Sequence, residues 1–164
     1  MKILLAVDGS TCSDIAVEEI GNRPWPAGST VKVLNAFELP LAITPEGWAP
    51  PPTYFQELDL AVTRQAQNIV EHAIRNLKSK ANETISIDGQ LLPGPASSII
   101  VDEAESWGAD LIVLGSHGYG RWERLLLGAV SQSVMSHAKC SVEVVRCRQT
   151  NRANGETDLS KERE

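Results

Sequence analysis

The chain has 164 residues, of which 42% are hydrophobic and 22% charged, a composition typical of one globular domain and unlike that of disordered or fibrous proteins. The formal net charge of −6, with Lys and Arg scattered among more numerous acids, argues against a nucleic-acid partner, which requires clustered positive charge. No apolar run approaches the roughly 20 residues that cross a bilayer. Because Asp8 interrupts the apolar start, we expect neither a membrane span nor a signal peptide.

The three cysteines form an odd set without CxxC spacing. This favours free thiols in a reducing, cytoplasmic location over a disulfide framework or a zinc site. Cys140 and Cys147 flank a predicted strand, which would hold them more than about 20 Å apart and prevent them from pairing with each other. Cys12 lies near the start of a predicted helix, where the dipole favours a thiolate. A redox role is the alternative for this residue, and the sequence argues against it because it shows no paired cysteine or nearby histidine.

The first half of the chain predicts two strands, two helices and a long loop. Each strand is a short apolar, β-rich run, and each helix repeats apolar residues three and four positions apart. Five prolines mark the loop, which is longer than most connections in compact domains. The predicted segments are a strand over Lys2–Val7, a helix over Ser13–Gly21, a strand over 31–36, a proline-rich insertion loop over 39–54 and a helix from Phe55 to Leu77.

The second half predicts three further strands, two helices and a polar tail. A strand begins near Ile85 and is expected to continue to Leu92 after an irregularity at Gly89. Residues 110–114 form a continuous apolar run, typical of the central strand of a parallel sheet. The other predicted segments are helices over Ala96–Trp107, with Gly108 as the stop, and Ala129–Ala138, a strand over 142–146 and a disordered tail over 147–164.

Strands that alternate with helices predict an α/β fold with right-handed crossovers between parallel strands. We expect a single domain over residues 1–146, built as a three-layer doubly wound sheet of five parallel strands in the order 3-2-1-4-5, with helices on both faces. In open parallel sheets, ligands bind outside the carboxyl ends of the strands, where the strand order reverses. The segments expected at this edge are residues 8–10, 35–37 and 115–118.

Two glycine clusters predict an anion-binding site at this edge. Gly115, Gly118 and Gly120 follow the predicted central strand and leave backbone N–H groups exposed, in the kind of concave nest that holds an anion. Gly128 opens the last helix, whose first N–H groups and dipole attract negative charge. Together they outline a phosphate site, although glycines at strand-to-helix turns also have a purely conformational explanation. The Walker, dinucleotide and nucleophile-elbow motifs are absent from the sequence, which argues against the common nucleotide hydrolases and dehydrogenases.

The glycine spacing resembles a known nucleotide signature. Gly115-Ser116-His117-Gly118, nine residues and then Gly128 are similar to the pattern of the ATP-binding branch of the universal stress proteins, which reads Gly, two residues, Gly, nine residues, Gly, Ser or Thr. The opening strand and turn with Ser13, residues 108–115 and residues 140–146 extend the resemblance over about residues 1–146. Ala129 departs from the pattern, because the family has Ser or Thr there. One hydroxyl contact to phosphate is therefore missing, which is expected to shift selectivity toward AMP or ADP.

The resemblance implies a dimeric, ATP-binding sensor or switch of the stress response. It implies that Asp8 contacts the ribose or adenine, that the Ala36 backbone reads the adenine edge, and that Mg²⁺ or Mn²⁺ binds through the phosphates. The last strand, Ser141–Arg146, would pair across a homodimer, and the general need to protect an edge strand favours the same arrangement. The candidate nucleotide-binding residues are Ala6, Val7, Asp8, Ala36, Gly115, Ser116, His117, Gly118, Gly128, Ala129, Val130 and Ser131.

Some of these assignments have alternatives. Asp8 is also a candidate N-cap of the first helix. Arg121 and Arg124 are candidate phosphate donors, but charges in such a loop are more typical of a solvated face. The alternative functions are a slow ATP hydrolase, for which no general base is evident between Gly118 and Ser131, and a dimeric interaction module that has lost nucleotide binding.

Overall fold

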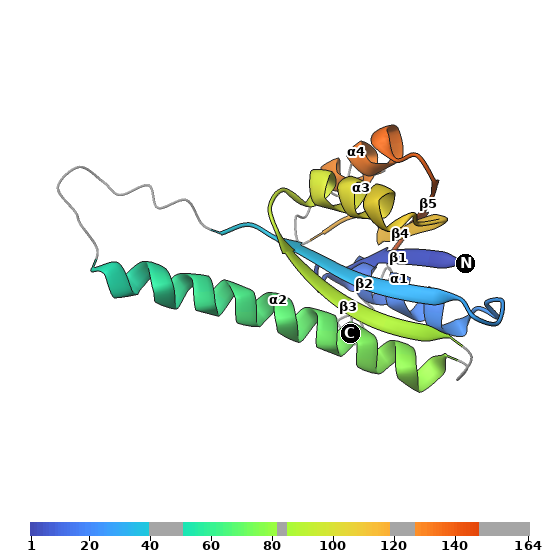
Figure 1. Ribbon diagram of the computed structural model, residues 1–164, viewed down its shortest axis with the longest axis horizontal. Coiled ribbons are helices and arrows are strands. Elements are labelled where there is room, and N and C mark those ends of the chain that lie inside the picture. The colour runs from blue at the N-terminus through green and yellow to red at the C-terminus, as the bar shows by residue number, and fades with distance from the viewer. Residues whose placement is uncertain (40–50, 82–84, 119–126, 148–164) are drawn as a thin grey trace, which may run out of the picture.

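The computed structural model describes residues 1–39, 51–81, 85–118 and 127–147. Its centre is a five-stranded sheet in the order β3-β2-β1-β4-β5, in which all neighbouring strands are parallel (Figure 1). This confirms the predicted α/β class and strand order. The elements are β1 (Lys2–Ala6), α1 (Thr11–Asn22), β2 (Thr30–Phe37), α2 (Pro52–Lys80), β3 (Ser86–Pro93), α3 (Ala96–Trp107), β4 (Leu111–Gly115), α4 (Ala129–His137) and β5 (Ser141–Val145).

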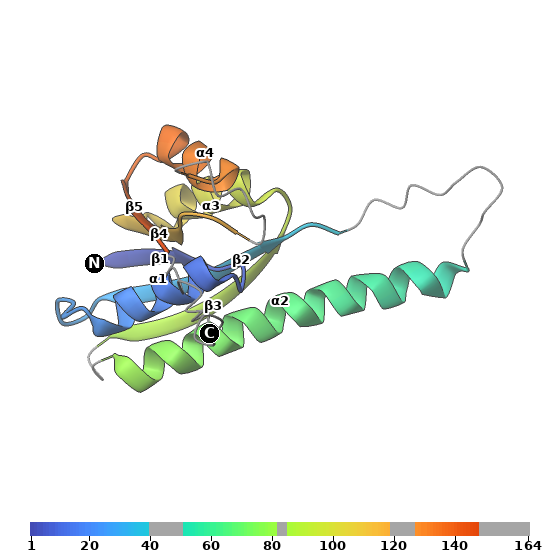
Figure 2. The same cartoon turned by 180° about the vertical axis from the view of Figure 1, so that it is seen from behind.

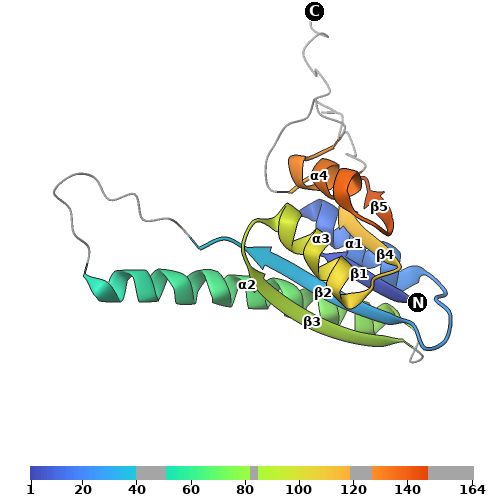
Figure 3. The same ribbon diagram turned by 45° about the horizontal axis from the view of Figure 1, so that its top comes forward.

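The sheet separates two apolar cores because successive strand residues point to opposite faces. On one face, Leu5 packs in a cluster with Ile20 of α1 and Leu77 of α2. On the other face, Leu4 packs in a cluster that includes Val134 of α4 and residues of α3. The helices therefore form two outer layers, with α1 and α2 on one side and α3 and α4 on the other (Figures 2 and 3).

The long helix α2 extends past the sheet, and its N-terminal part projects beyond the strands (Figures 1 and 2). It begins at Pro52, before the predicted start at Phe55, because proline is well suited to the first helical turn, where its missing N–H has no partner to lose. Its later apolar residues Val70 and Leu77 are buried against the sheet. Phe55 is only partly buried, so the predicted apolar stripe packs on the sheet mainly over its C-terminal half.

β3 continues without interruption through Gly89, so the expected irregularity there is wrong. Gly89 pairs with Val33 of β2 in regular register. A β-carbon at Gly89 would lie 2.8 Å from side-chain atoms of both Val70 and Ile74 of α2. The glycine therefore allows a close approach of helix and strand instead of a bulge.

Several expectations concern segments outside the described residues. These are residues 40–50 of the predicted insertion loop, residues 119–126 with both arginine candidates, and residues 148–164 of the predicted tail. Across the described parts of the chain, no helix combines the length and the apolar character needed to span a membrane.

Candidate functional site

A cavity of about 240 Å³ opens at the carboxyl ends of β1, β2 and β4, beside the start of α4. Each candidate nucleotide-binding residue named from the sequence lines this cavity. The sequence analysis did not select the remaining lining residues. Several of them could have been found from the strand or helix spacing that places them on the same face as another lining residue. Leu34 lies one strand period before Ala36, and Ile100 lies one helical turn after Ala96. The remaining lining residues are Ser13, Leu34, Ala96, Ile100 and Leu114.

The turn between β1 and α1 is held by its own side chains. Ser10 is the N-cap of α1, and its hydroxyl oxygen accepts a hydrogen bond from the N–H of Ser13 at 3.3 Å. The backbone N–H and the hydroxyl of Ser10 lie 3.0 and 2.7 Å from Oδ1 of Asp8. Gly9 has a φ of 81°, in the left-handed region that favours glycine. Asp8 is therefore not the N-cap, and its carboxylate is fixed at the cavity wall.

Residues 115–118 form the bend at the end of β4, which we call the β4 bend. Two of its positions must be glycine, because neighbouring atoms leave no room for a side chain. A β-carbon at Gly115 would lie 2.8 Å from the carbonyl carbon of Cys12, so α1 packs directly against the end of β4. A β-carbon at Gly118 would lie 2.6 Å from Oδ2 of Asp8. Neither glycine has a positive φ, so close approach and not backbone conformation explains them, and the same contacts bring the backbone to the cavity wall.

The bends that follow β4 and precede α4 meet at Ser116. The N–H of Gly128 donates to the Ser116 carbonyl at 2.7 Å, and the N–H of Ser116 donates to the Val145 carbonyl at 2.8 Å. The hydroxyl of Ser131 lies 3.0 Å from both the Ser116 and the Gly128 carbonyl oxygens. Since Ser131 is only 2% exposed, its hydroxyl joins the two bends. Any phosphate contact of this residue would therefore fall mainly to its backbone N–H.

The N-terminus of α4 lines one wall of the cavity. Gly128 is the N-cap and makes no side-chain cap hydrogen bond. The intrahelical bonds begin with the N–H of Gln132, which donates to the Gly128 carbonyl at 3.0 Å. The N–H groups of Ala129, Val130 and Ser131 therefore have no partner within the helix. Together with the helix dipole, they make this wall favourable for an anion.

The opposite wall combines small apolar side chains with main-chain polar groups. The N–H of Val7 donates to the Leu34 carbonyl at 2.9 Å, so the main-chain groups of Leu34 face β1. Ala36 lies two residues further along β2 and faces the same side, beyond the end of β1 at Ala6. The buried amide of Asn35 also donates to the Val7 carbonyl at 2.7 Å and holds this corner in place. The arrangement suits the edge of a flat heterocyclic base.

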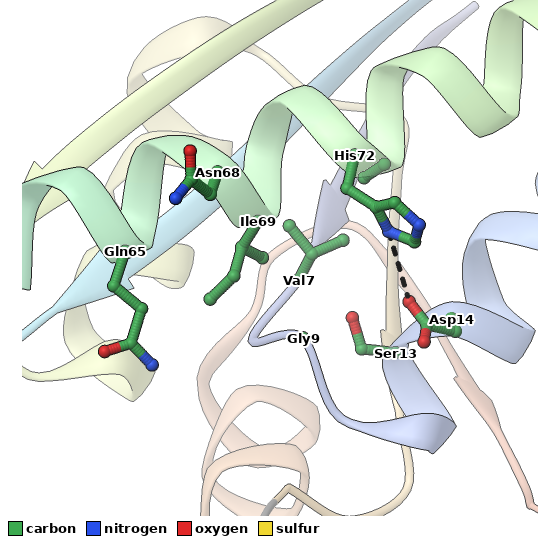
Figure 4. Close-up of a pocket in the computed structure, with 9 residues that line it drawn as sticks. Val7, Gly9, Ser13, Asp14, Gln65, Asn68, Ile69 and His72 are labelled. Carbon is green, nitrogen blue, oxygen red and sulfur yellow. Dashed lines mark ion pairs between the residues drawn. The ribbon is translucent and has the colours of Figure 1, made fainter.

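A second cavity, of about 300 Å³, lies between α1, α2 and the same turn (Figure 4). Nδ1 of His72 points toward Asp14 and lies 4.0 Å from its Oδ1. The first cavity includes the start of α4, whose first N–H groups lack helical partners, so the first is the better candidate for a phosphate site. The two cavities share Val7 and Ser13. The lining of the second is Val7, Gly9, Ser13, Asp14, Gln65, Asn68, Ile69, His72 and Ala73.

Asp8 is the acidic residue of the first cavity's lining. Within the described ranges, no group of three or more His, Cys, Asp or Glu side chains could hold a metal ion. A divalent cation at this cavity would therefore take most of its ligands from phosphate oxygens and water, which is the usual way in which Mg²⁺ enters nucleotide sites.

The expectation that the cysteines are unpaired is wrong for two of them. Cys12 and Cys147 form a disulfide across a sequence separation of 135 residues, with a Cα–Cα distance of 5.1 Å. Sequence spacing could not reveal this pair, because only the sheet order brings the end of β5 beside the first turn of α1. Cys140 is free, and burial raises the pKa of its thiol.

Comparison with known proteins supports the architecture. The family model described as "Universal stress protein family" matches residues 1–146. Universal stress protein A homolog 2 of Coxiella burnetii is 41% identical over 80 residues, which cover 48% of this chain and 54% of that protein. Universal stress protein Mb2019 of Mycobacterium bovis is 30% identical over 154 residues, covering 88% of this chain and 48% of that protein. The chain thus spans about half the length of these two relatives.

Solved structures share the fold. Hypothetical protein MJ0577 superposes with a TM-score of 0.75 at 25% identity, covering 91% of this chain and 97% of that one. A universal stress protein in complex with cAMP gives a TM-score of 0.61 at 21% identity, covering 89% and 96%. The family protein At3g01520 of Arabidopsis thaliana, solved with AMP bound, gives 0.62 at 16% identity, covering 91% and 93%. At these lower identities, the similarity shows a common fold.

Proposed function

The chain belongs to the universal stress protein family, and on this basis we propose that it binds an adenine nucleotide and acts as a nucleotide-dependent regulatory protein of the stress response. A cytoplasmic location is part of the same proposal. The observation that carries it is the convergence, on one cavity, of anion-binding backbone groups with a small apolar wall.

The phosphates would lie against the bends around Ser116 and the start of α4. There, α4 begins with N–H groups that have no helical partner, and the glycines let the backbone approach closely. The adenine would lie against Ala6 and Val7, with its edge facing the main chain of Ala36. Asp8, whose carboxylate is fixed by Ser10, would accept a hydrogen bond from the ribose or the base.

The choice among adenine nucleotides follows from Ala129. Because this residue supplies no hydroxyl at the first position of α4, the contact to the distal phosphates is weaker than in the family pattern. Two neighbours of the same fold were solved with AMP and cAMP, which each carry a single phosphate. We therefore favour AMP or ADP as a ligand at least as strong as ATP, with Mg²⁺ or Mn²⁺ entering only together with a nucleotide.

The second part of the proposal is a homodimer that forms through β5. In the described sheet, β5 pairs with β4 on one side and forms an edge on the other. Edge strands of this kind are normally protected or paired, and a second copy supplies a matching strand. Nucleotide binding at the neighbouring bends would then shift the equilibrium between monomer and dimer, and this shift would be the regulatory output.

Equilibrium titration with ATP, ADP and AMP, each with and without Mg²⁺, tests the proposal directly. We expect saturable binding of all three nucleotides, with AMP or ADP at least as tight as ATP, and competition between them. Mass analysis of small molecules released from freshly isolated, denatured protein gives an independent reading. The absence of binding in both experiments would contradict the proposal and favour an interaction module that has lost the nucleotide.

A slow ATP hydrolase is the alternative that shares this site. The described lining offers Asp8 as the acidic group, but both polar groups of Ser10 already engage one of its oxygens. Phosphate release, measured against the Gly118→Ala variant, separates the two functions. Release that exceeds the variant's rate would indicate an enzyme, and equal rates would indicate a sensor.

A further inference from the structure

The disulfide between Cys12 and Cys147 lies behind the cavity wall, where Cys12 contacts the lining residues Gly115 and Ser116. Cys12 is the second residue of α1, and Cys147 follows the end of β5. Their Cα–Cα distance of 5.1 Å is within the range that disulfides span. We propose that this pair is a reversible redox site, whose disulfide form holds the strand-end turns of the cavity in place and whose dithiol form releases them.

Cys12 does not line the cavity itself, but on the α1 side it contacts two residues that do, Gly115 and Ser116. Its Cβ lies so near the end of β4 that a β-carbon at Gly115 would be 2.8 Å from it, and its sulfur lies 3.9 Å from Oγ of Ser116. The next residue, Ser13, lines the cavity, and its hydroxyl accepts a hydrogen bond from the N–H of Asp8 at 3.3 Å. The first turn of α1 therefore touches both the β1 turn and the β4 bend.

Cys147 is connected to the same bend from the β5 side. Two residues before it, the carbonyl of Val145 accepts a hydrogen bond from the N–H of Ser116 at 2.8 Å. Three links therefore form a closed ring. Cys12 contacts Ser116, Ser116 bonds Val145, and the chain after Val145 returns to Cys12 through the disulfide. When the covalent link opens, only non-covalent contacts hold α1, the β4 bend and the end of β5 together.

The two sulfurs have suitable properties for thiol–disulfide exchange. Cys147 is half-buried and Cys12 is only 8% exposed, so a small disulfide arriving from solvent meets the Cys147 sulfur first. The Cys147 thiolate attacks a low-molecular-weight disulfide, which releases one small thiol and leaves a mixed disulfide. The Cys12 thiolate then attacks the Cys147 sulfur and releases the second small thiol. Two protein thiols are oxidised, one small disulfide is reduced, and both protons end on the released thiols.

Reversibility is expected for a protein in the cytoplasm. Disulfides of cytosolic proteins are usually transient and catalytic or redox-sensing, because glutathione and thioredoxin keep thiols reduced. Cys140 precedes β5, and burial raises the pKa of its thiol. It also has no disulfide partner within the described residues, so it serves as the matched control cysteine.

The first experiment needs no nucleotide. The full chain is equilibrated in mixtures of reduced and oxidised glutathione, its thiols are trapped by alkylation, and hydrogen exchange is measured in the same samples. We expect Cys12 and Cys147 to be oxidised together and to return to thiols with excess reduced glutathione. Peptides that span residues 10–13 and 114–117 should exchange at least about threefold faster in the reduced form, and β3 at the far edge of the sheet should not change.

Variants separate the redox site from general effects of oxidation. Cys147→Ser should exchange like the reduced wild type under all conditions, whereas Cys140→Ser should respond like the wild type. Both changes are at partly exposed positions, so folded protein is expected. The proposal is overturned if the two cysteines do not interconvert in these mixtures, or if hydrogen exchange at the two turns is the same in both forms.

The consequence for ligand binding rests on the proposed function. If the cavity binds AMP, the oxidised protein should bind it about three- to tenfold more tightly than the reduced protein, because its turns are preorganised. Equal affinities would show that the redox site does not act on the cavity and would overturn the coupling, while leaving nucleotide binding intact. If neither form binds AMP, the proposed function fails, and the exchange experiment still decides whether the redox site exists.

Discussion

Gly118 faces Asp8 so closely that a β-carbon at Gly118 would lie 2.6 Å from Oδ2 of the carboxylate. The other oxygen, Oδ1, is held by the N–H and the hydroxyl of Ser10 at 3.0 and 2.7 Å. The carboxylate cannot turn away from Gly118 without losing these hydrogen bonds. The contact therefore links the turn after β1 to the bend after β4 at the cavity wall.

The Gly118→Ala substitution tests this link. Gly118 is not among the glycines with positive φ, so alanine causes no backbone strain and acts through the new methyl group alone. We expect adenine-nucleotide affinity to fall about tenfold, equivalent to about 1.4 kcal/mol, because the carboxylate must shift and the methyl group enters the cavity. Isothermal titration calorimetry with AMP measures the change.

Gly108→Ala is the matched control for this experiment. Gly108 has a φ of 69° and ends α3 away from the cavity, with no other atom within 4 Å of an added β-carbon. The substitution should destabilise the fold by about 1–2 kcal/mol through left-handed strain and leave affinity unchanged. If Gly118→Ala bound AMP as tightly as the wild type, Asp8 and the β4 bend would not form the ligand contact that we propose.

The sequence predicted the parts of this cavity that depend on local patterns. The apolar runs predicted the strands, and their alternation with helices predicted a parallel sheet, whose carboxyl ends bring Asp8, Ala36 and Gly115 to one edge. The spacing between Gly118 and Gly128 predicted that two bends would meet. These features follow from hydrophobic periodicity and from glycines that leave room for close approach, which each short segment carries by itself.

The features that the sequence analysis missed depend on contacts between distant segments. The Cys12–Cys147 disulfide forms only because β5 ends beside α1, and no spacing rule connects residues separated by 135 positions. Gly89 was interpreted as an irregularity, yet its role is to let α2 approach β3. The role of the Ser131 hydroxyl in joining the two bends was also missed, while the expected place of Ser131 at the phosphates stays a prediction.

The Ala129→Ser substitution tests the selectivity argument. A hydroxyl at the first position of α4 would add one neutral-to-charged hydrogen bond to a distal phosphate, worth about 1.5 kcal/mol at the lower end of the usual range. We expect ATP affinity to rise about tenfold while AMP affinity changes little. Ala138→Ser, at the other end of α4, adds the same group outside the cavity and should change neither value. An equal gain for ATP and AMP would contradict the assignment of Ala129 to the distal phosphates.

The Cys140 thiol provides a pH-dependent test of burial. Burial disfavours the thiolate and raises the pKa of Cys140 above its ordinary value. The stability that this group contributes is therefore complete below its unfolded pKa and is lost as the pH rises through the folded pKa. In the oxidised protein, the pH midpoint for alkylation of Cys140 should be higher in buffer than in urea. Coincident midpoints would show that burial does not affect this thiol.

The direction of the β5 main chain predicts how to disrupt a dimer without disrupting the sheet. The Val145 carbonyl bonds Ser116 at the end of β4, so the main-chain groups of Val145 face β4 and those of Val144 face the free edge. Val144→Pro removes an outward N–H, a change that edge strands tolerate. We expect the dimer dissociation constant, measured by sedimentation, to rise at least about tenfold with the fold retained, since one hydrogen bond is lost per copy. Val145→Pro should instead destabilise the β4–β5 pair, and an unchanged dimer in Val144→Pro would exclude β5 as the interface.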